Sequence, residues 1–144
     1  MRATINGLRI AIVALFIYWV LLFIGTHLPP DRIFIPLHLS DKVLHAVAFA
    51  GLSFLIAWAV PTNDAKLYQN TLTAALIAVV YAALDELLQI PVGRTADWMD
   101  FAADCIGVCI GLGAYTFVRA LIFKAGLQFF RSPEDVRPGR SLPK

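Results

Sequence analysis

Residues 10–24 read IAIVALFIYWVLLFI, fifteen apolar residues without an interruption. The apolar segment continues to Leu28 and stops at Pro29 and Pro30. A helix rises 1.5 Å per residue, so this segment is long enough to cross the roughly 30 Å hydrocarbon core of a bilayer. A cleaved signal peptide is the alternative, but no small-x-small cleavage site follows the run. We therefore expect a retained transmembrane helix over residues 10–28.

The rest of the chain is similarly apolar. Of its 144 residues, 59% are hydrophobic and only 15% are charged, whereas soluble domains have roughly 25% charged residues. In lipid the backbone must satisfy its own hydrogen bonds, which leaves helices or a closed barrel, and long apolar runs lack the alternation of a barrel strand. We predict an all-α integral membrane protein. The sequence contains no nucleic-acid-binding motif.

Three further segments complete a predicted bundle of four transmembrane helices. Ser40 is a favourable N-cap for the second helix, and Pro61 follows its end. The apolar part of the third helix, residues 72–84, is too short to span alone, so the polar residues that follow must lie in its last turns. The predicted spans are residues 10–28, 41–60, 68–90 and 96–123.

These spans divide the chain into three parts. Residues 1–9 are predicted to form a cytoplasmic N-terminal segment, and residues 10–123 the transmembrane domain. Residues 124–144 form a tail that is rich in proline and charge from Arg131 onward, which predicts a disordered cytoplasmic segment.

The basic residues predict the orientation. With four alternating spans, nine of the twelve Lys and Arg residues fall on the side of the two termini, and only Arg32, Lys42 and Arg94 on the other. By the positive-inside rule, both termini are expected in the cytoplasm and the protein in the inner membrane. Ionisable groups near the bilayer are costly and usually functional. Seven of the ten acidic residues lie on the outer side: Asp31, Asp41, Asp85, Glu86, Asp97, Asp100 and Asp104.

On the second helix, Asp41 and His45 are four residues apart and share a face, with Lys42 beside Asp41. An acid in the first turn is also favoured by the helix dipole, so Asp41 has a structural explanation. His45 is either a structural histidine held by Asp41, or a ligand or proton carrier.

On the third helix, Asp85 and Gln89 share a face, and Glu86 lies about 100° round the helix from Asp85. We expect at least one of the two carboxylates to face the bundle interior. An outer carboxylate could instead snorkel to the headgroups, which is an alternative for Glu86 to a place in the polar pocket.

The fourth helix, expected to begin near Thr95 or Ala96, carries Asp97, Asp100 and Asp104 along one stripe. Asp104 lies roughly 10 Å deeper than Asp97. Three like charges repel, so cations, a bound metal or protonation must relieve them. Arg94 is the nearest counter-charge in the sequence, and Lys42 and His45 are available from the second helix.

A divalent cation is a possible cofactor of this cluster. Hard oxygen ligands suit Mg²⁺, Mn²⁺ or Ca²⁺. The candidate ligands are Asp85, Glu86, Asp97, Asp100 and Asp104. Cys105 and Cys109 lack further Cys or His partners at metal-binding spacing, and we expect them to be small buried residues.

Gly107 and Gly111 form a Gly-x-x-x-Gly pattern below the acids. Such a pattern permits close helix packing, either within the bundle or between subunits, and the sequence leaves the oligomeric state open.

The order and spacing of three polar motifs carry a family resemblance. These motifs are Asp41-Lys42-x-x-His45, Asp85-Glu86-x-x-Gln89 and Gly93-Arg94-x-x-Asp97-x-x-Asp100. With the glycine-rich fourth helix, the chain resembles the VanZ-like family of small bacterial membrane proteins over about residues 8–123. The family position that is usually Asn is Asp104 in this chain. The resemblance implies a place in the cell envelope and, through the family's namesake, a link to teicoplanin resistance.

These observations favour one function and leave an alternative. The first is an outward-facing polar pocket that binds or modulates an envelope component: a lipid headgroup, an envelope precursor or a glycopeptide-related ligand. Lys42, His45 and Arg94 would contact a phosphate, or the acids a cationic or sugar-bearing group.

The alternative is a divalent-metal-dependent membrane enzyme that acts on a lipid-linked phosphate, with His45 as general base. A proton pathway through Asp104 is a third hypothesis for the function. It would need polar residues deeper in the fourth helix, which offers only Tyr115 and Thr116 before Arg119.

Overall fold

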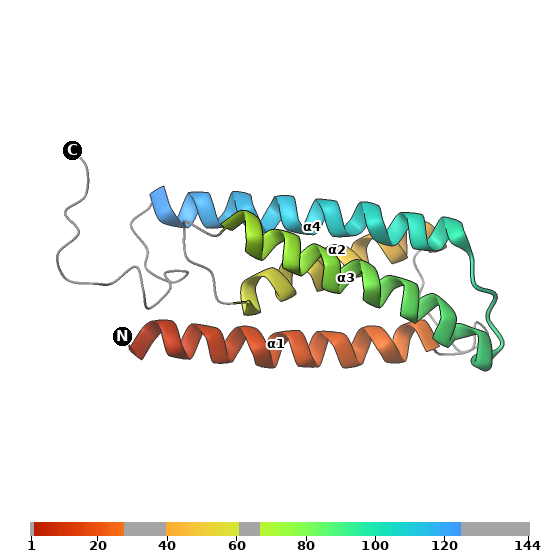
Figure 1. The fold of residues 1–144 in the computed structure, drawn as a ribbon. Helices are drawn as coiled ribbons and strands as arrows, with labels where there is room; N and C mark the ends of the chain where they lie inside the picture. The colour runs from red at the N-terminus through yellow and green to blue at the C-terminus, as the bar shows by residue number, and fades with distance from the viewer. Residues whose placement is uncertain (1, 28–39, 61–66, 125–144) are drawn as a thin grey trace.

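The computed structural model describes residues 2–27, 40–60 and 67–124, and these form an all-α bundle (Figure 1). All four predicted helices are present, and each is long and apolar enough to cross a membrane. The predicted end of the first span at Leu28, Asp31 and Arg32, the 61–66 segment and the tail beyond Lys124 lie outside the described residues. The elements are α1 (Arg2–His27), α2 (Asp41–Ala59), α3 (Leu67–Gln89), the 3-10 turn η3 (Ile90–Val92) and α4 (Trp98–Lys124).

The helix boundaries differ from the prediction mainly at two places. α1 begins at Arg2, because the residues before the apolar run contain no proline and continue the helix. α4 begins at Trp98, after the expected Thr95 or Ala96. At the start of α2, the carbonyl of Ser40 accepts bonds from two N–H groups of the first turn, as at an N-cap, but its side chain makes no capping bond.

The end of α3 is closed by a Schellman motif. The Gly93 N–H donates to the Ile90 carbonyl and the Arg94 N–H donates to the Gln89 carbonyl, both at 3.2 Å. Gly93 has a φ of 82°, which is the left-handed conformation that this motif requires and that glycine adopts without strain. The turn therefore places Arg94 directly beside the polar end of α3.

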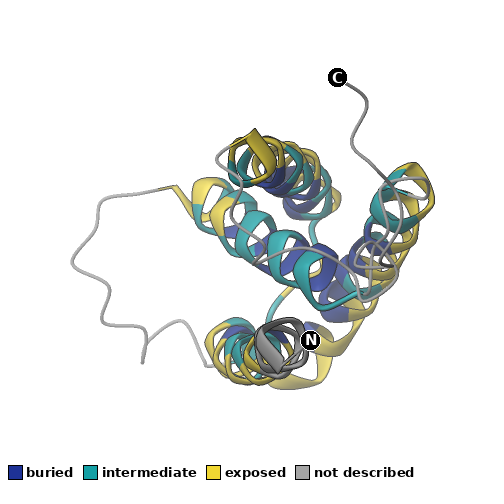
Figure 2. Cartoon of the chain, turned by 90° about the vertical axis from the view of Figure 1, so that its left-hand side faces the viewer, coloured by how far each residue is buried: buried dark blue, intermediate teal, exposed yellow. Residues whose placement is uncertain are grey.

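α2 packs against all three other helices, most extensively against α4. In the end-on view of Figure 2, the buried faces of the helices point toward one another and the exposed faces point outward. A Cβ atom added at Gly107 or Gly111 would overlap the carbonyl of Ala46 or Ala50, respectively. The Gly-x-x-x-Gly pattern thus packs within the bundle, where it brings the backbones of α2 and α4 together.

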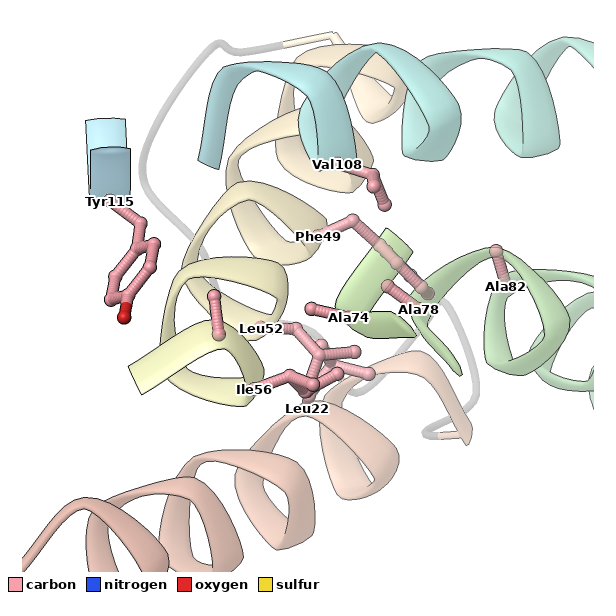
Figure 3. Packing of buried hydrophobic residues seen from close by; sticks show 10 residues of the cluster. Leu22, Phe49, Leu52, Ile56, Ala74, Ala78, Ala82, Val108 and Tyr115 are labelled. Carbon is pink, nitrogen blue, oxygen red and sulfur yellow. The ribbon is translucent and has the colours of Figure 1, made fainter. Parts of the chain in front are cut away.

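The apolar core combines the alanine methyl groups of α3 with larger side chains from the other helices (Figure 3). Ala74, Ala78 and Ala82 recur every fourth residue along α3 and leave room for Phe49 and Leu52 of α2. The outward faces of the helices carry large apolar residues such as Phe16, which suit a lipid environment.

The expectation that both cysteines are buried is wrong. Cys105 is half-buried and Cys109 is exposed. The helix face that carries them turns partly toward lipid, because the interior face of α4 is occupied by Asp104, Gly107 and Gly111.

The antiparallel path of the chain gathers four helix ends at one end of the bundle, on the right in Figure 1. These are the C-terminal ends of α1 and α3 and the N-terminal ends of α2 and α4. We call this the polar end, because it holds the ionisable residues described next.

Candidate functional site

The polar end has a buried layer beneath an exposed rim. Asp41, Lys42 and Asp97 form the rim, with 56%, 44% and 39% of their side chains exposed. The buried layer holds most of the predicted site residues: His45, Asp85, Glu86, Gln89, Asp100 and Asp104. The alternative in which Glu86 snorkels to the headgroups does not hold, because both neighbouring acids of α3 are buried.

A triad of ionisable residues, one from each of three helices, lies at the centre of the buried layer. The Nδ1 atom of His45 on α2 lies 3.0 Å from Oδ1 of Asp104 on α4 and 4.0 Å from Oε1 of Glu86 on α3. The expected partner of this histidine was Asp41, on its own helix. Because α2 and α4 pack so closely, the deeper carboxylate of α4 reaches the imidazole instead.

Asp85 is a second buried carboxylate, and three side chains donate hydrogen bonds to it. It accepts bonds from the hydroxyls of Thr26 and Tyr81, at 3.1 and 3.3 Å, and from the Gln89 side-chain amide at 3.1 Å. His27 lies 3.9 Å away. Asp85 and Gln89 thus share a face and a bond, as their spacing predicts, and α1 is tied to α3 through this carboxylate.

No sequence motif points to Thr26, His27 or Tyr81 as site residues. Thr26 and His27 follow an apolar run, and two polar residues at that point are a signal that the helix end is not simply lipid-facing. Tyr81 stands four residues before Asp85, the spacing at which helix side chains meet.

Lys42 supplies the counter-charge for the acidic stripe of α4. Its Nζ atom lies 2.9 Å from Oδ1 of Asp100 and 3.2 Å from Oδ2 of Asp97. Of the cations that the sequence offered for this role, Lys42 therefore takes it and the nearest in the chain, Arg94, does not. The turn after α3 instead directs Arg94 toward α1 and α2, where its guanidinium donates to the Thr26 carbonyl at 3.3 Å and lies 3.5 Å from Asp41.

Asp97 is the N-cap of α4. Its Oδ1 atom accepts a bond from the Met99 N–H at 2.9 Å, and its backbone carbonyl accepts bonds from Asp100 and Phe101. The Met99 N–H bond, together with the Lys42 ammonium, lowers the pKa of the Asp97 carboxyl. Its own N–H donates to Oε2 of Glu86 at 3.0 Å, so the cap also fixes the buried glutamate.

Three buried atoms of the polar end have no hydrogen-bond partner among the described residues: Oε1 of Glu86, Oδ2 of Asp104 and Nε2 of His27. The first two belong to the central triad. Such atoms are rare in folded proteins, because an unpaired buried acceptor costs about 1–3 kcal/mol.

The predicted metal ligands separate into different environments. Ligand atoms of His45, Glu86 and Asp104 lie within 4.8 Å of one another, as do those of Asp41, His45 and Asp100. Within the described residues, neither of these groups includes Asp85 or Asp97, which have the hydrogen-bond donors given above.

An apolar groove of about 440 Å³ runs along the lipid-facing side of α2 and α4 and begins at the rim. Lys42 and Met99 line it near the polar end, and Ile110 lines it deepest in the bundle. A second groove, of about 350 Å³, lies between α1, α2 and α3 and is lined by apolar and aromatic residues, among them Trp19, Ile77 and Tyr81.

Four long apolar helices with a cluster of ionisable residues buried at one end define a small multi-pass membrane protein. The chain belongs to the VanZ/LLP1 family, whose model matches residues 10–122. This match confirms the resemblance seen in the polar motifs, and it includes the whole polar end from Thr26 to Asp104. No curated protein and no solved structure matches the chain.

Proposed function

We propose that the polar end faces outward from the inner membrane and binds the headgroup of an envelope amphiphile, whose apolar chain lies in the groove between α2 and α4. The observation that carries the proposal is the position of Lys42. It belongs both to the charged rim and to the lining of the groove, so one molecule with a polar head and an apolar tail fits both surfaces.

The charges of the rim favour a particular headgroup. The rim consists of the carboxylates of Asp41 and Asp97 and the ammonium of Lys42, so it presents more carboxylates than cations. A headgroup that also offers donors, such as sugar hydroxyls or an amine, pairs with these carboxylates, while its phosphate contacts Lys42 or Arg94. A lipid headgroup and a sugar-bearing envelope precursor share this chemistry. A role in glycopeptide resistance belongs to the same proposal, if the amphiphile is the precursor that such antibiotics target.

The metal-dependent enzyme has weaker support. Catalysis by a divalent cation needs an open coordination position for the substrate phosphate. The residues of the central triad are at most 6% exposed, so an ion bound there would be shielded from a headgroup at the rim.

Mass spectrometry of the protein extracted from its own membrane tests the binding. We expect the wild-type chain to retain an amphiphile after delipidation, and Val47→Trp, which fills the groove between α2 and α4 from an exposed position, to lose it. Ile77→Trp fills the other groove and is the matched control, which should retain the molecule. Lys42→Gln should weaken retention, and Lys124→Gln, at the opposite end of α4, should not. Equal retention by both tryptophan variants, or none by the wild type, contradicts the proposal.

A separate experiment tests the orientation. In a Cys105→Ala, Cys109→Ala background, Thr95→Cys at the polar end should react with a membrane-impermeant maleimide in intact cells. Tyr68→Cys, at the start of α3, should react only after lysis. The opposite pattern would place the polar end in the cytoplasm.

A further inference from the structure

Hydrogen bonding joins only two of the three members of the central triad of His45, Glu86 and Asp104. Each residue comes from a different helix, and each is at least nine-tenths buried, with exposed fractions of 5%, 6% and 0%. Only one short contact joins them, the 3.0 Å approach of His45 to Asp104. Glu86 stands 4.0 Å from the imidazole, too far for a hydrogen bond.

The unpaired carboxylate oxygens indicate that the triad binds a cation. Oε1 of Glu86 and Oδ2 of Asp104 have no hydrogen-bond partner among the described residues, although other atoms of the same carboxylates do. Two carboxylates so close together in a poorly solvated interior repel strongly, and a cation between them relieves this repulsion.

The separations match those of ligands on one small cation. With bonds of about 2.0–2.2 Å, adjacent ligands of an octahedral ion are about 3.0 Å apart, two ligands of a tetrahedral ion about 3.4 Å, and opposite ligands of an octahedral ion about 4.2 Å. The two distances from His45, 3.0 and 4.0 Å, are close to this range, and all three ligand atoms lie within 4.8 Å of one another.

The neighbouring group of Asp41, His45 and Asp100 has no such need for a metal ion. Its carboxylates already have cationic partners, since Asp41 lies 3.5 Å from Arg94 and Asp100 lies 2.9 Å from Lys42. A cation there would have to displace these side chains.

We propose that His45, Glu86 and Asp104 form a buried site for Mn²⁺ or Zn²⁺ that joins α2, α3 and α4 beneath the rim. The imidazole distinguishes this site from the all-oxygen site expected from the sequence, because nitrogen ligands favour Zn²⁺ and Mn²⁺ over Mg²⁺ and Ca²⁺. The ion takes the place of the Nδ1 proton and is bound by Oε1 of Glu86 and one carboxylate oxygen of Asp104. Its role is structural, because the ligands are shielded from the rim, and it does not depend on the proposed headgroup binding.

Manganese binding to the purified full-length chain tests the site. The protein in lipid nanodiscs is treated with a chelator, dialysed against Mn²⁺ alone and examined by electron paramagnetic resonance. We expect roughly one bound Mn²⁺ per chain, displaced by Zn²⁺, with a nitrogen coupling in the electron spin-echo spectrum that changes when histidine is labelled with ¹⁵N. His45→Gln should abolish the coupling, and His27→Gln should leave it unchanged.

Carboxylate variants identify the ligand set. Glu86→Gln and Asp104→Asn should each weaken Mn²⁺ binding at least about tenfold. Asp100→Asn is the matched control, because it removes a carboxylate of the neighbouring group, and it should bind as the wild type does. Circular dichroism and size-exclusion chromatography establish that each variant is folded. Absence of binding by the wild type, a bound ion without histidine coupling, or loss of binding in Asp100→Asn alone would each overturn the proposal. The wild-type spectrum decides the matter even if a carboxylate variant does not fold.

Discussion

His45 and Asp104 lie 3.0 Å apart although 59 residues separate them in the chain. The contact joins α2 to α4 inside the bundle, one turn below the rim. It gives His45 a partner on another helix, and it makes Asp104 a component of the buried network.

The first prediction concerns this pair. In the presence of a chelator, Asp104→Leu should lower the free energy of unfolding by about 1–3 kcal/mol, because it leaves the buried imidazole without its partner. His45→Phe in the same background should recover part of the loss. A double-mutant cycle in mixed micelles measures the coupling, and we expect at least about 0.5 kcal/mol. Additive effects of the two substitutions would mean that the pair does not interact.

The second prediction concerns the close approach of α2 and α4. Gly107→Ala and Gly111→Ala should each destabilise the protein by about 1–3 kcal/mol, since the added methyl group meets the backbone of α2. Gly113→Ala is the matched control on the same helix, because nothing lies within 4 Å of its added Cβ. Unfolding in mixed micelles measures all three variants, and similar stability of all three would contradict the packing.

The third prediction concerns the attachment of α1. Thr26→Val removes the hydroxyl that donates to Asp85 and should cost about 1 kcal/mol, because the buried carboxylate loses one of its donors. Thr73→Val removes a hydroxyl that bonds only to the backbone of its own helix, on an exposed face, and should be nearly neutral. Thermal unfolding in nanodiscs compares the two, and an equal effect would argue against the link between α1 and α3.

The fourth prediction is a pH dependence at the start of α4. The folded-state pKa of Asp97 is below the unfolded value of about 3.9, so its ionised form stabilises the fold fully above that value. This contribution is lost as the pH falls through the folded-state pKa. In the Asp97→Asn variant the side chain can still cap the helix, but it does not ionise.

Thermal unfolding between about pH 5 and pH 2 therefore tests the role of this charge. The wild type should lose more stability on acidification than Asp97→Asn, although other carboxylates titrate in both proteins. If the stability of both proteins fell equally with pH, the charge of Asp97 would not contribute to stability.

The local patterns of the chain predicted much of the polar end. The spacing of Asp85 and Gln89 predicted their shared face, and they are hydrogen-bonded. The Gly-x-x-x-Gly pattern predicted a close helix contact. The sequence did not decide which of the available cations pairs with the acidic stripe, and the nearest, Arg94, does not, because the Schellman turn at Gly93 directs its side chain toward Asp41 and Thr26.

Composition and the lengths of the apolar runs by themselves determined that this chain is an all-α protein with four helices suited to a membrane. They do so because lipid cannot satisfy the backbone and because the rise of a helix sets the length that a span requires. Short-range spacing likewise determined which polar residues share a face. Only the tertiary structure decided which residues of different helices meet: His45 with Asp104, Lys42 with Asp100, and Thr26 with Asp85. Those pairings depend on the rotation and depth of each helix, which are set by packing against its neighbours. No periodic pattern in the sequence encodes this rotation and depth.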